Sequence, residues 1–208
     1  MVVLRPRRVG DTRERLLDAA ESSVLEKGFA ATSIDELIAA VGITKSGFFY
    51  HFRDKSELAT ALLERYLARE GKILDDLFAR AGELHEDPLH AFLIGLKMLA
   101  EMMASLPEAH PGCLVAAYTY QEQLFNRDVR DLNAAAVLRW RKRFRDRLDA
   151  IALRYPPRIE VDMDDLADMV SALADGGIIL SKAVRDKDAL SRQILLYRQF
   201  VRCVFLGA

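Results

Sequence analysis

Between residues 33 and 58 the chain reads SIDELIAAVGITKSGFFYHFRDKSEL. Ser33 and Glu36 have the spacing of a capping box, so a short helix is expected to begin here and to end at Gly42. Thr44 is a second N-cap residue, and an aromatic-rich segment follows it. Two short helices joined by a tight turn that contains glycine are typical of a helix-turn-helix. The pattern therefore predicts that the second helix is placed to enter the major groove of DNA.

The second short helix carries side chains that suit nucleic acid. Hydrogen-bond donors come from Thr44, Lys45, Ser46, Tyr50 and His51, and Gly47 allows a close approach of the backbone to DNA. Charge is partitioned in the same way, with net +3 over residues 1–10, net −4 over residues 11–43 and net +2 over residues 44–55. Phe48 and Phe52 are expected in the core. The basic arm, Arg5, Arg7 and Arg8, is either a groove or phosphate contact or a solvated terminus.

Helical signals continue through the rest of the chain, whereas alternation with a period of two is nearly absent. We expect an all-α fold. Its helices are predicted over residues 12–27, 34–41, 45–52, from 55 with a weak break at Gly71, 88–106, 113–125, 133–154, from 162, and 188–205. An N-terminal domain, residues 1–54, is expected to be followed by a helical domain, residues 55–208.

Composition restricts the function classes that remain. A formal net charge of −1 excludes an overall field that would hold the whole molecule on nucleic acid or an anionic bilayer, so any polyanion site must be local. The 51% of hydrophobic residues excludes an intrinsically disordered chain. Two cysteines favour a reduced, cytoplasmic protein, and the charges within residues 89–106 argue against a membrane span.

The segment from Gly28 to Leu58 resembles the DNA-binding signature of the TetR family of transcriptional regulators. The resemblance is carried by GFAATSI at residues 28–34 and by GITKSGFFYHFRDKSEL at residues 42–58. It implies an N-terminal helix-turn-helix domain, a helical C-terminal domain that binds a small molecule and dimerises, and repression relieved by that ligand. The residues that match phosphate or sugar contacts in the family are Ser33, Thr44, Phe49, Tyr50, His51 and Lys55, and those nearest base edges are Lys45, Ser46 and Gly47. Phe49 departs from the family pattern, which commonly has tyrosine there.

The effector site is expected in the interior of the helical domain, where apolar and aromatic side chains line a pocket with a few polar groups. The predicted lining residues are Phe92, Leu96, Met103, Cys113, Tyr118, Gln121, Phe125, Trp140 and Phe144. Each of them is also compatible with ordinary core packing. Cys113, which follows Pro111-Gly112 at an expected helix start, is either a buried cysteine or a thiol that senses oxidants or electrophiles.

The last two helices are expected to form the seam of a homodimer, because their apolar stripes are broad and Gly176-Gly177 allows close contact. The predicted seam residues are Leu166, Met169, Val170, Leu173, Gly177, Ile178, Leu190, Ile194, Tyr197, Val201 and Val204. Such a dimer predicts a pseudo-palindromic double-stranded DNA operator.

Other features of the sequence bear on nucleic-acid binding elsewhere in the chain, on metal binding and on catalysis. A second basic cluster over residues 139–147 is expected to be a solvated helix face balanced by the acids of residues 160–168. The histidines His85, His90 and His110 do not have metal-ligand spacing with each other or with Cys113, and no catalytic motif accompanies them. We therefore expect no metal, no cofactor and no enzymatic activity. A DNA-binding organiser that has no effector remains open.

Overall fold

The computed structural model of the chain describes residues 9–207, with side chains from Thr12 onward. The predicted basic arm, Arg5, Arg7 and Arg8, lies outside the described residues. Nine α-helices and one 3₁₀ turn make up the regular structure of residues 9–207: α1 Val9–Ala31, α2 Ile34–Val41, α3 Lys45–His51, α4 Lys55–Leu84, α5 Pro88–Ala104, α6 Leu114–Thr119, η1 Glu122–Leu124, α7 Arg127–Ala152, α8 Met163–Ala183 and α9 Ala189–Leu206. The expected all-α fold class is confirmed.

These helices form two compact units. The first unit contains the described residues up to Leu67 together with Cys113–Ala134, and the second contains Ala68–Gly112 together with the residues from Ala135 onward. The long helices α4 and α7 each contribute to both units. The predicted boundary between two domains after residue 54 stays a prediction. In the structure, Cys113–Ala134 belongs to the same compact unit as the N-terminal helices.

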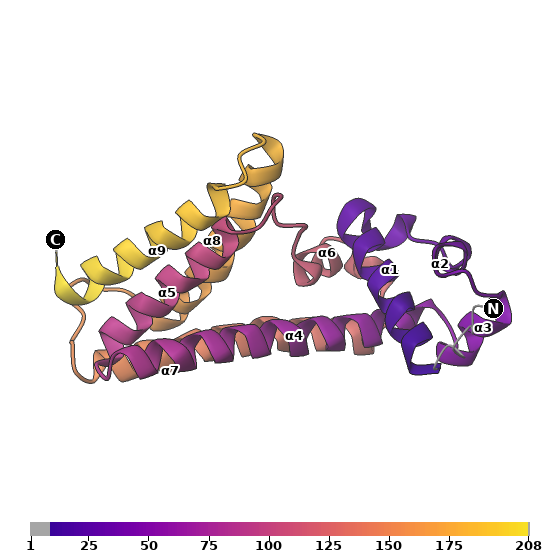
Figure 1. Ribbon diagram of the computed structural model, residues 1–208. Coiled ribbons are helices and arrows are strands. Elements are labelled where there is room, and N and C mark those ends of the chain that lie inside the picture. The colour runs from indigo at the N-terminus through magenta and orange to yellow at the C-terminus, as the bar shows by residue number, and fades with distance from the viewer. Residues whose placement is uncertain (1–8, 208) are drawn as a thin grey trace. The chain divides into compact units, whose positions relative to one another are not determined.

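In the first unit, α1, α2 and α3 pack around the beginning of α4 (Figure 1). Their shared core includes Leu17, Leu37, Phe48, Phe52 and Leu62, all at most 1% exposed. Burial of these apolar side chains is the main force that holds the short helices, which are too short to be stable in isolation. The expectation that Phe48 and Phe52 are core residues is confirmed.

In the second unit, α5, α8 and α9 lie side by side (Figure 1). Aromatic rings from three helices meet in the core, where Phe78 is stacked on Phe92 at 5.6 Å and stands edge-on to Phe144 at 5.8 Å. Gly177 lets α8 approach α9 closely, since a Cβ atom at this position would lie 2.8 Å from the Cα atom of Leu190. The two last helices therefore pack on each other within one chain.

Several predicted helix limits need correction. Gly71 does not interrupt α4, because one glycine costs only about 1 kcal/mol in a helix and the buried residues Leu74 and Leu77 follow it. The helix expected over residues 113–125 ends at Thr119 and is followed by the 3₁₀ turn, since Gln121 has non-helical dihedral angles of φ −124° and ψ 27°. α7 starts at Arg127, six residues before the expected position.

The basic cluster on α7 is balanced by carboxylates, as the sequence predicted. Arg141 donates to Asp168 with its Nε at 2.9 Å, and Arg145 donates to Asp164 with its Nη1 at 2.7 Å. Arg143 forms two 2.9 Å hydrogen bonds with Asp75 of α4. These ion pairs neutralise the charges of three α7 arginines inside the second unit.

The buried carboxylate of Asp87, the N-cap residue of α5, links the start of α5 to Tyr155, which follows α7. It accepts hydrogen bonds from the backbone N–H and the Nδ1 atom of His90 at 3.0 and 2.9 Å, and from the hydroxyl of Tyr155 at 2.7 Å. Burial opposes ionisation of this carboxyl group, but the hydrogen bonds from His90 and Tyr155 outweigh it and hold the pKa of Asp87 well below its usual range.

Candidate nucleic-acid interface

The turn between α2 and α3 is built by local capping. The Ser33 hydroxyl accepts a hydrogen bond from the backbone N–H of Glu36 at 3.2 Å, which is half of the predicted capping box. Gly42 ends α2 in the left-handed region with φ 70°, and its N–H donates to the carbonyl of Ile38 at 2.9 Å. The chain therefore leaves α2 and enters α3 within three residues.

The helix α3 begins on Thr44, whose hydroxyl accepts from the backbone N–H of Gly47 at 3.2 Å and lies 3.0 Å from the hydroxyl of Ser46. Phe48 is fully buried and holds one face of the helix on the core of the first unit. With seven residues the helix is about 10 Å long, and its width matches the major groove, which is about 12 Å wide.

The opposite face of α3 is exposed. The side chain of Lys45 is 68% exposed, and Tyr50 and Phe49 are 74% and 44% exposed. The rings of Tyr50 and His51 meet edge-on with centroids 5.1 Å apart, and Phe49 lies edge-on to Phe48 at 5.4 Å. This face offers an ammonium group, two small hydroxyls and a phenol, which is a set of donors suited to base edges and phosphates.

Lys55, predicted to contact phosphate, is held by the protein in this structure. Its ammonium group donates to the carbonyl oxygen of Phe29 at 2.7 Å and lies 4.3 Å from the centre of the Phe29 ring. Burial lowers the pKa of Lys55. The residue thus ties the start of α4 to the end of α1, and its predicted phosphate contact stays a prediction.

The end of α1 is where the segment 113–134 joins the helix-turn-helix. Gly28 has φ 84° and ψ 163°, and the amide oxygen of Gln121 accepts a hydrogen bond from the N–H of Ala30 at 3.1 Å. Phe29 packs against the rings of Phe125 and Tyr118, at 4.6 and 5.8 Å, and these two rings are stacked on each other at 4.4 Å. The Tyr118 hydroxyl also donates to the carbonyl of Ala59 in α4 at 3.0 Å. The sequence did not predict these contacts between residues 118–125 and the end of α1. Gly28 and Phe29 are the first two residues of the segment 28–34 that resembles the TetR signature.

The residues predicted to line the effector pocket fall into both units. Tyr118, Gln121, Phe125 and the half-buried Cys113 belong to the first unit. Phe92, Leu96 and Phe144 are at most 2% exposed in the core of the second unit, with Trp140 and Met103 partly buried against it. The structure therefore does not collect the nine residues in one core, and their common effector role stays a prediction.

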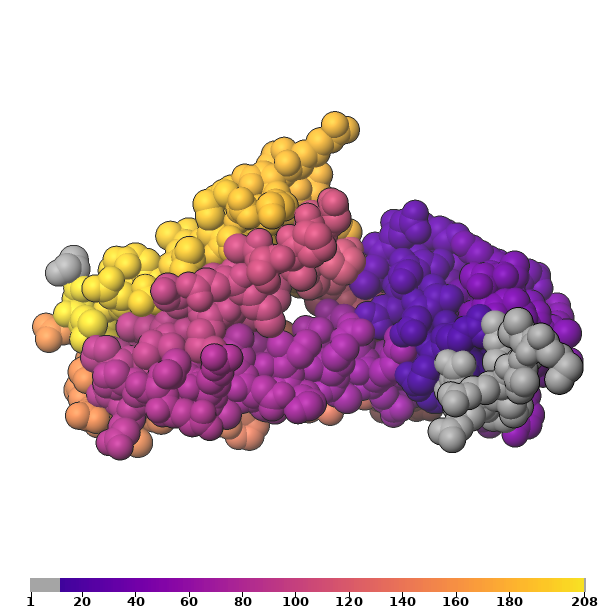
Figure 2. Space-filling view, viewed as in Figure 1, coloured from indigo at the N-terminus to yellow at the C-terminus, as the bar shows by residue number. Residues whose placement is uncertain are grey.

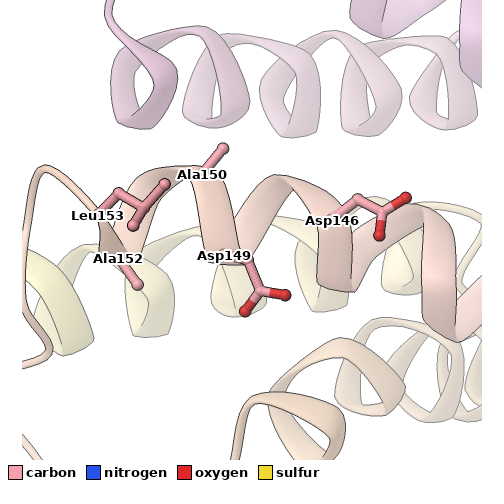
Figure 3. Close-up of a pocket in the computed structure, with 5 residues that line it drawn as sticks. All are labelled: Asp146, Asp149, Ala150, Ala152 and Leu153. Carbon is pink, nitrogen blue, oxygen red and sulfur yellow. The ribbon is translucent and has the colours of Figure 1, made fainter.

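One open depression lies on α7 and is lined by Asp146, Asp149, Ala150, Ala152 and Leu153 (Figure 3). It contains none of the predicted effector residues. Lys142 donates to Asp146 at 2.7 Å and Arg145 donates to Asp149 at 2.8 Å, so both carboxylates already have cationic partners. Among the described residues, no group of three or more His, Cys, Asp or Glu side chains could hold a metal ion.

The predicted seam residues are placed within the protomer. Leu166, Val170, Gly177, Leu190, Ile194, Tyr197, Val201 and Val204 are buried, and Met169, Leu173 and Ile178 are partly buried. These side chains fill the core of the chain itself, because α9 packs on both α8 and α5.

The outer faces of α8 and α9 carry other apolar side chains: Ile179 at 55%, Leu180 at 43%, Leu195 at 43% and Leu196 at 55% exposed. Figure 2 shows the α8–α9 hairpin, in orange and yellow, at the surface of the second unit. The dimer role of the predicted seam residues stays a prediction, and the outer faces of both helices carry the apolar side chains that a second copy can reach.

No helix among residues 9–207 has the length and apolar character needed to cross a bilayer.

Comparison with known proteins places this architecture among regulators. Residues 16–62 match the family model described as bacterial regulatory proteins, tetR family. The chain is 26% identical to the HTH-type transcriptional regulator YxaF of Bacillus subtilis over 183 residues, which cover 87% of this chain and 90% of YxaF. It is 33% identical to YvkB of the same organism and 32% identical to the HTH-type transcriptional repressor NemR of Escherichia coli, over 44% and 39% of this chain. These two alignments span 45% of YvkB and 41% of NemR, less than half of either protein.

Solved structures support the same fold along nearly the whole chain. A TetR-family transcriptional regulator from Agrobacterium tumefaciens superposes with a TM-score of 0.77 at 17% identity, covering 95% of this chain and 100% of that one. A regulatory protein TetR from Rhodobacter sphaeroides gives a TM-score of 0.74 at 24% identity, covering 90% of this chain and 97% of that one. At sequence identities of 17% and 24%, the similarity to these two structures shows a shared fold and nothing more specific.

Proposed function

Because residues 16–62 match the tetR family model and the chain is 26% identical to YxaF over 87% of its length, we propose that it is a cytoplasmic repressor of the TetR family that binds a pseudo-palindromic operator as a homodimer. A small hydrophobic or electrophilic effector releases it from DNA. The observation that carries the proposal is the two-sided helix α3, which is buried through Phe48 and exposed through Lys45 and Tyr50. A helix held in this way presents donors to the groove without loss of core packing.

Substitution of the exposed side chains tests the DNA-binding role. Lys45→Ala or Tyr50→Ala should weaken binding to a duplex selected from a random library by the wild-type protein. A lost base contact is worth about 1–3 kcal/mol, so the dissociation constant should rise by about 5- to 150-fold. Lys142→Ala, which removes a comparably exposed lysine on α7, is the control and should bind normally.

Circular dichroism should show that all three variants are folded, and binding by the wild-type protein should fall steeply with salt. Retention of wild-type affinity by both Lys45→Ala and Tyr50→Ala would contradict the proposed reading surface.

The proposed dimer uses the outer faces of α8 and α9. In an isologous interface the same patch of both copies is buried, and Ile179, Leu180, Leu195 and Leu196 supply apolar material for it. The two reading helices of such a dimer must be about 34–36 Å apart, or a multiple of one DNA turn, to enter successive major grooves. This spacing is the reason for the expected pseudo-palindrome.

Matched charge insertions test the dimer. Leu196→Glu should shift the protein to a monomer in sedimentation velocity, because a carboxylate would be buried in the apolar seam. Leu153→Glu places the same charge on a leucine directly after α7 that is 91% exposed, and it should leave the association state unchanged. A dimer of unchanged affinity in Leu196→Glu would contradict the use of this face.

Effector binding is coupled to DNA release through linkage. A ligand that prefers the conformer with the wrong spacing of reading helices lowers operator affinity by that same preference. In a thermal-shift screen of metabolites and toxins, a specific ligand at 100 times its dissociation constant should stabilise the protein by about 2.7 kcal/mol. A screen without any stabilising compound would favour the alternative of a DNA-binding organiser that has no effector.

A second candidate function is thiol sensing through Cys113. The Cys113 side chain is the N-cap of α6, where its Sγ atom accepts a hydrogen bond from the backbone N–H of Ala116 at 3.4 Å. Such a donor favours the thiolate, which is the reactive form toward electrophiles. N-ethylmaleimide should then release the wild-type protein from operator DNA but should not release Cys113→Ser. Equal release of both proteins would remove this candidate.

A further inference from the structure

Lys45, on the exposed face of α3, has a carboxylate beside it. The Lys45 ammonium lies 4.0 Å from Oδ1 of Asp35, which belongs to the first turn of α2. Beside this pair, Lys27 forms an ion pair with Glu36, and hydrogen bonds from Lys27 help to lower the pKa of Glu36. An acidic side chain therefore accompanies the cation that the proposed function places nearest to base edges.

The position of Asp35 has two electrostatic consequences. Lys45 is the first residue of α3, where the partial positive charge of the helix N-terminus repels an ammonium group. The carboxylate of Asp35 offsets this repulsion and gives the long lysine side chain a preferred direction. Asp35 itself is 83% exposed and Lys45 is 68% exposed, so core packing does not require either side chain.

The Asp35–Lys45 pair affects contacts to phosphate and contacts to base edges differently. Attraction to phosphate depends on the net charge that Lys45 presents, because it arises from neutralisation and counterion release. Hydrogen bonding to the neutral acceptors O6 and N7 of guanine depends instead on where the three N–H donors point. A carboxylate 4 Å away reduces the net charge, while the ammonium group keeps N–H donors that can bind a base edge.

Building on the proposed function, we infer that Asp35 is a specificity-determining residue, which positions the Lys45 ammonium for a guanine edge and reduces its attraction to bare phosphate. Lys45 adds affinity at an operator that offers guanine at this position. On unrelated DNA it adds little. Asp35 acts through Lys45 and is in this sense a positioning residue.

The test compares Asp35→Asn with the wild-type protein on two duplexes, the selected operator and a random-sequence duplex. Affinity for the random duplex should rise about two- to fivefold, the equivalent of an exposed ion pair. The slope of log K against log salt on that duplex should become steeper by about 0.9, as expected for one additional phosphate contact. Operator affinity should stay equal or fall, so the ratio of operator to random binding decreases.

Three further variants separate this role from simpler explanations. Asp76→Asn removes a carboxylate that forms a 2.7 Å ion pair with Lys72 in the second unit, and it should alter neither the ratio nor the slope. Asp35→Glu should restore the wild-type ratio. In a Lys45→Ala background, Asp35→Asn should have no effect on the slope, because there is no ammonium group left to direct.

An unchanged slope and ratio in Asp35→Asn, the same change in Asp76→Asn, or an effect that persists without Lys45 would each overturn the inference. Each of these outcomes leaves selective operator binding by the wild-type protein intact. Failure of the proposed function is different, since the wild-type protein would then select no duplex from the library.

Discussion

The contact between Gly28 and Gln121 predicts a large cost for the single methyl group of Gly28→Ala. Gly28 has φ 84° and ψ 163°, a region that is nearly restricted to glycine and costs another residue about 1–3 kcal/mol. A Cβ atom here would lie 2.5 Å from Nε2 of Gln121, so the amide must move. Its movement breaks the hydrogen bond from Ala30, which is worth about 0.5–1.5 kcal/mol. The total loss of unfolding free energy should be about 1.5–4.5 kcal/mol.

Gly42→Ala is the matched control for this prediction. Gly42 also has a positive φ, 70°, but nothing lies within 4 Å of the position of its Cβ atom. The substitution should therefore cost only the left-handed backbone conformation, about 1–2 kcal/mol. Urea unfolding followed by circular dichroism, at one protein concentration, measures both values.

A double-mutant cycle isolates the contribution of the amide. In a Gln121→Ala background, Gly28→Ala should cost only the backbone strain, which gives a coupling energy of about 0.5–1.5 kcal/mol between the two sites. The reasoning is refuted if Gly28→Ala destabilises no more than Gly42→Ala, or if the effects of the two substitutions in the cycle simply add.

Three further predictions concern interactions away from α3. Tyr118→Phe removes the buried hydrogen bond to the Ala59 carbonyl and should lower the unfolding free energy by about 1 kcal/mol, with little change in the circular dichroism spectrum of the native state. Asp87→Asn tests a pH dependence: because the folded-state pKa of Asp87 is lowered, the stability that its charge contributes is complete above about pH 5 and is lost as the pH falls below about 4. The stability difference between wild type and Asp87→Asn should therefore shrink in acid, and a constant difference from pH 3 to 7 would contradict the assignment. Arg65→Met should destabilise by about 1–3 kcal/mol, since this mostly buried guanidinium group of α4 binds three carboxylates of α1, whereas Arg127→Met breaks an exposed pair and should have an effect below about 0.5 kcal/mol. Equal effects of the two arginine substitutions would argue against the role of burial.

The helix-turn-helix could be predicted from local signals because local physics forms it. Ser33 and Thr44 cap the helices that follow them, Gly42 takes the left-handed conformation that ends α2, and Phe48 is buried. The caps and the left-handed glycine depend on residues within one or two helical turns, and the burial of Phe48 follows from its apolar character. The exposed side of α3 followed from the same information, since a seven-residue helix with one buried face leaves the other face to solvent.

The location of Tyr118 and Phe125 could not be predicted in this way. Their aromatic character predicted burial, which is correct, and an effector pocket in the helical domain was the predicted place for both. The structure packs both rings against Phe29 in the core of the first unit. Burial is a property of a side chain, but the identity of its neighbours depends on contacts between segments almost 90 residues apart.

Taken alone, the amino-acid sequence determined most of the helical segments, the bounds of α2, the start of α3, and the apolar stripes of α8 and α9 that avoid water. The tertiary structure decided what covers those side chains. Leu190 and Tyr197 face their own chain, and Ile179 and Leu196 face outward. The physical reason is that hydrophobic free energy depends on the area removed from water and not on which surface removes it.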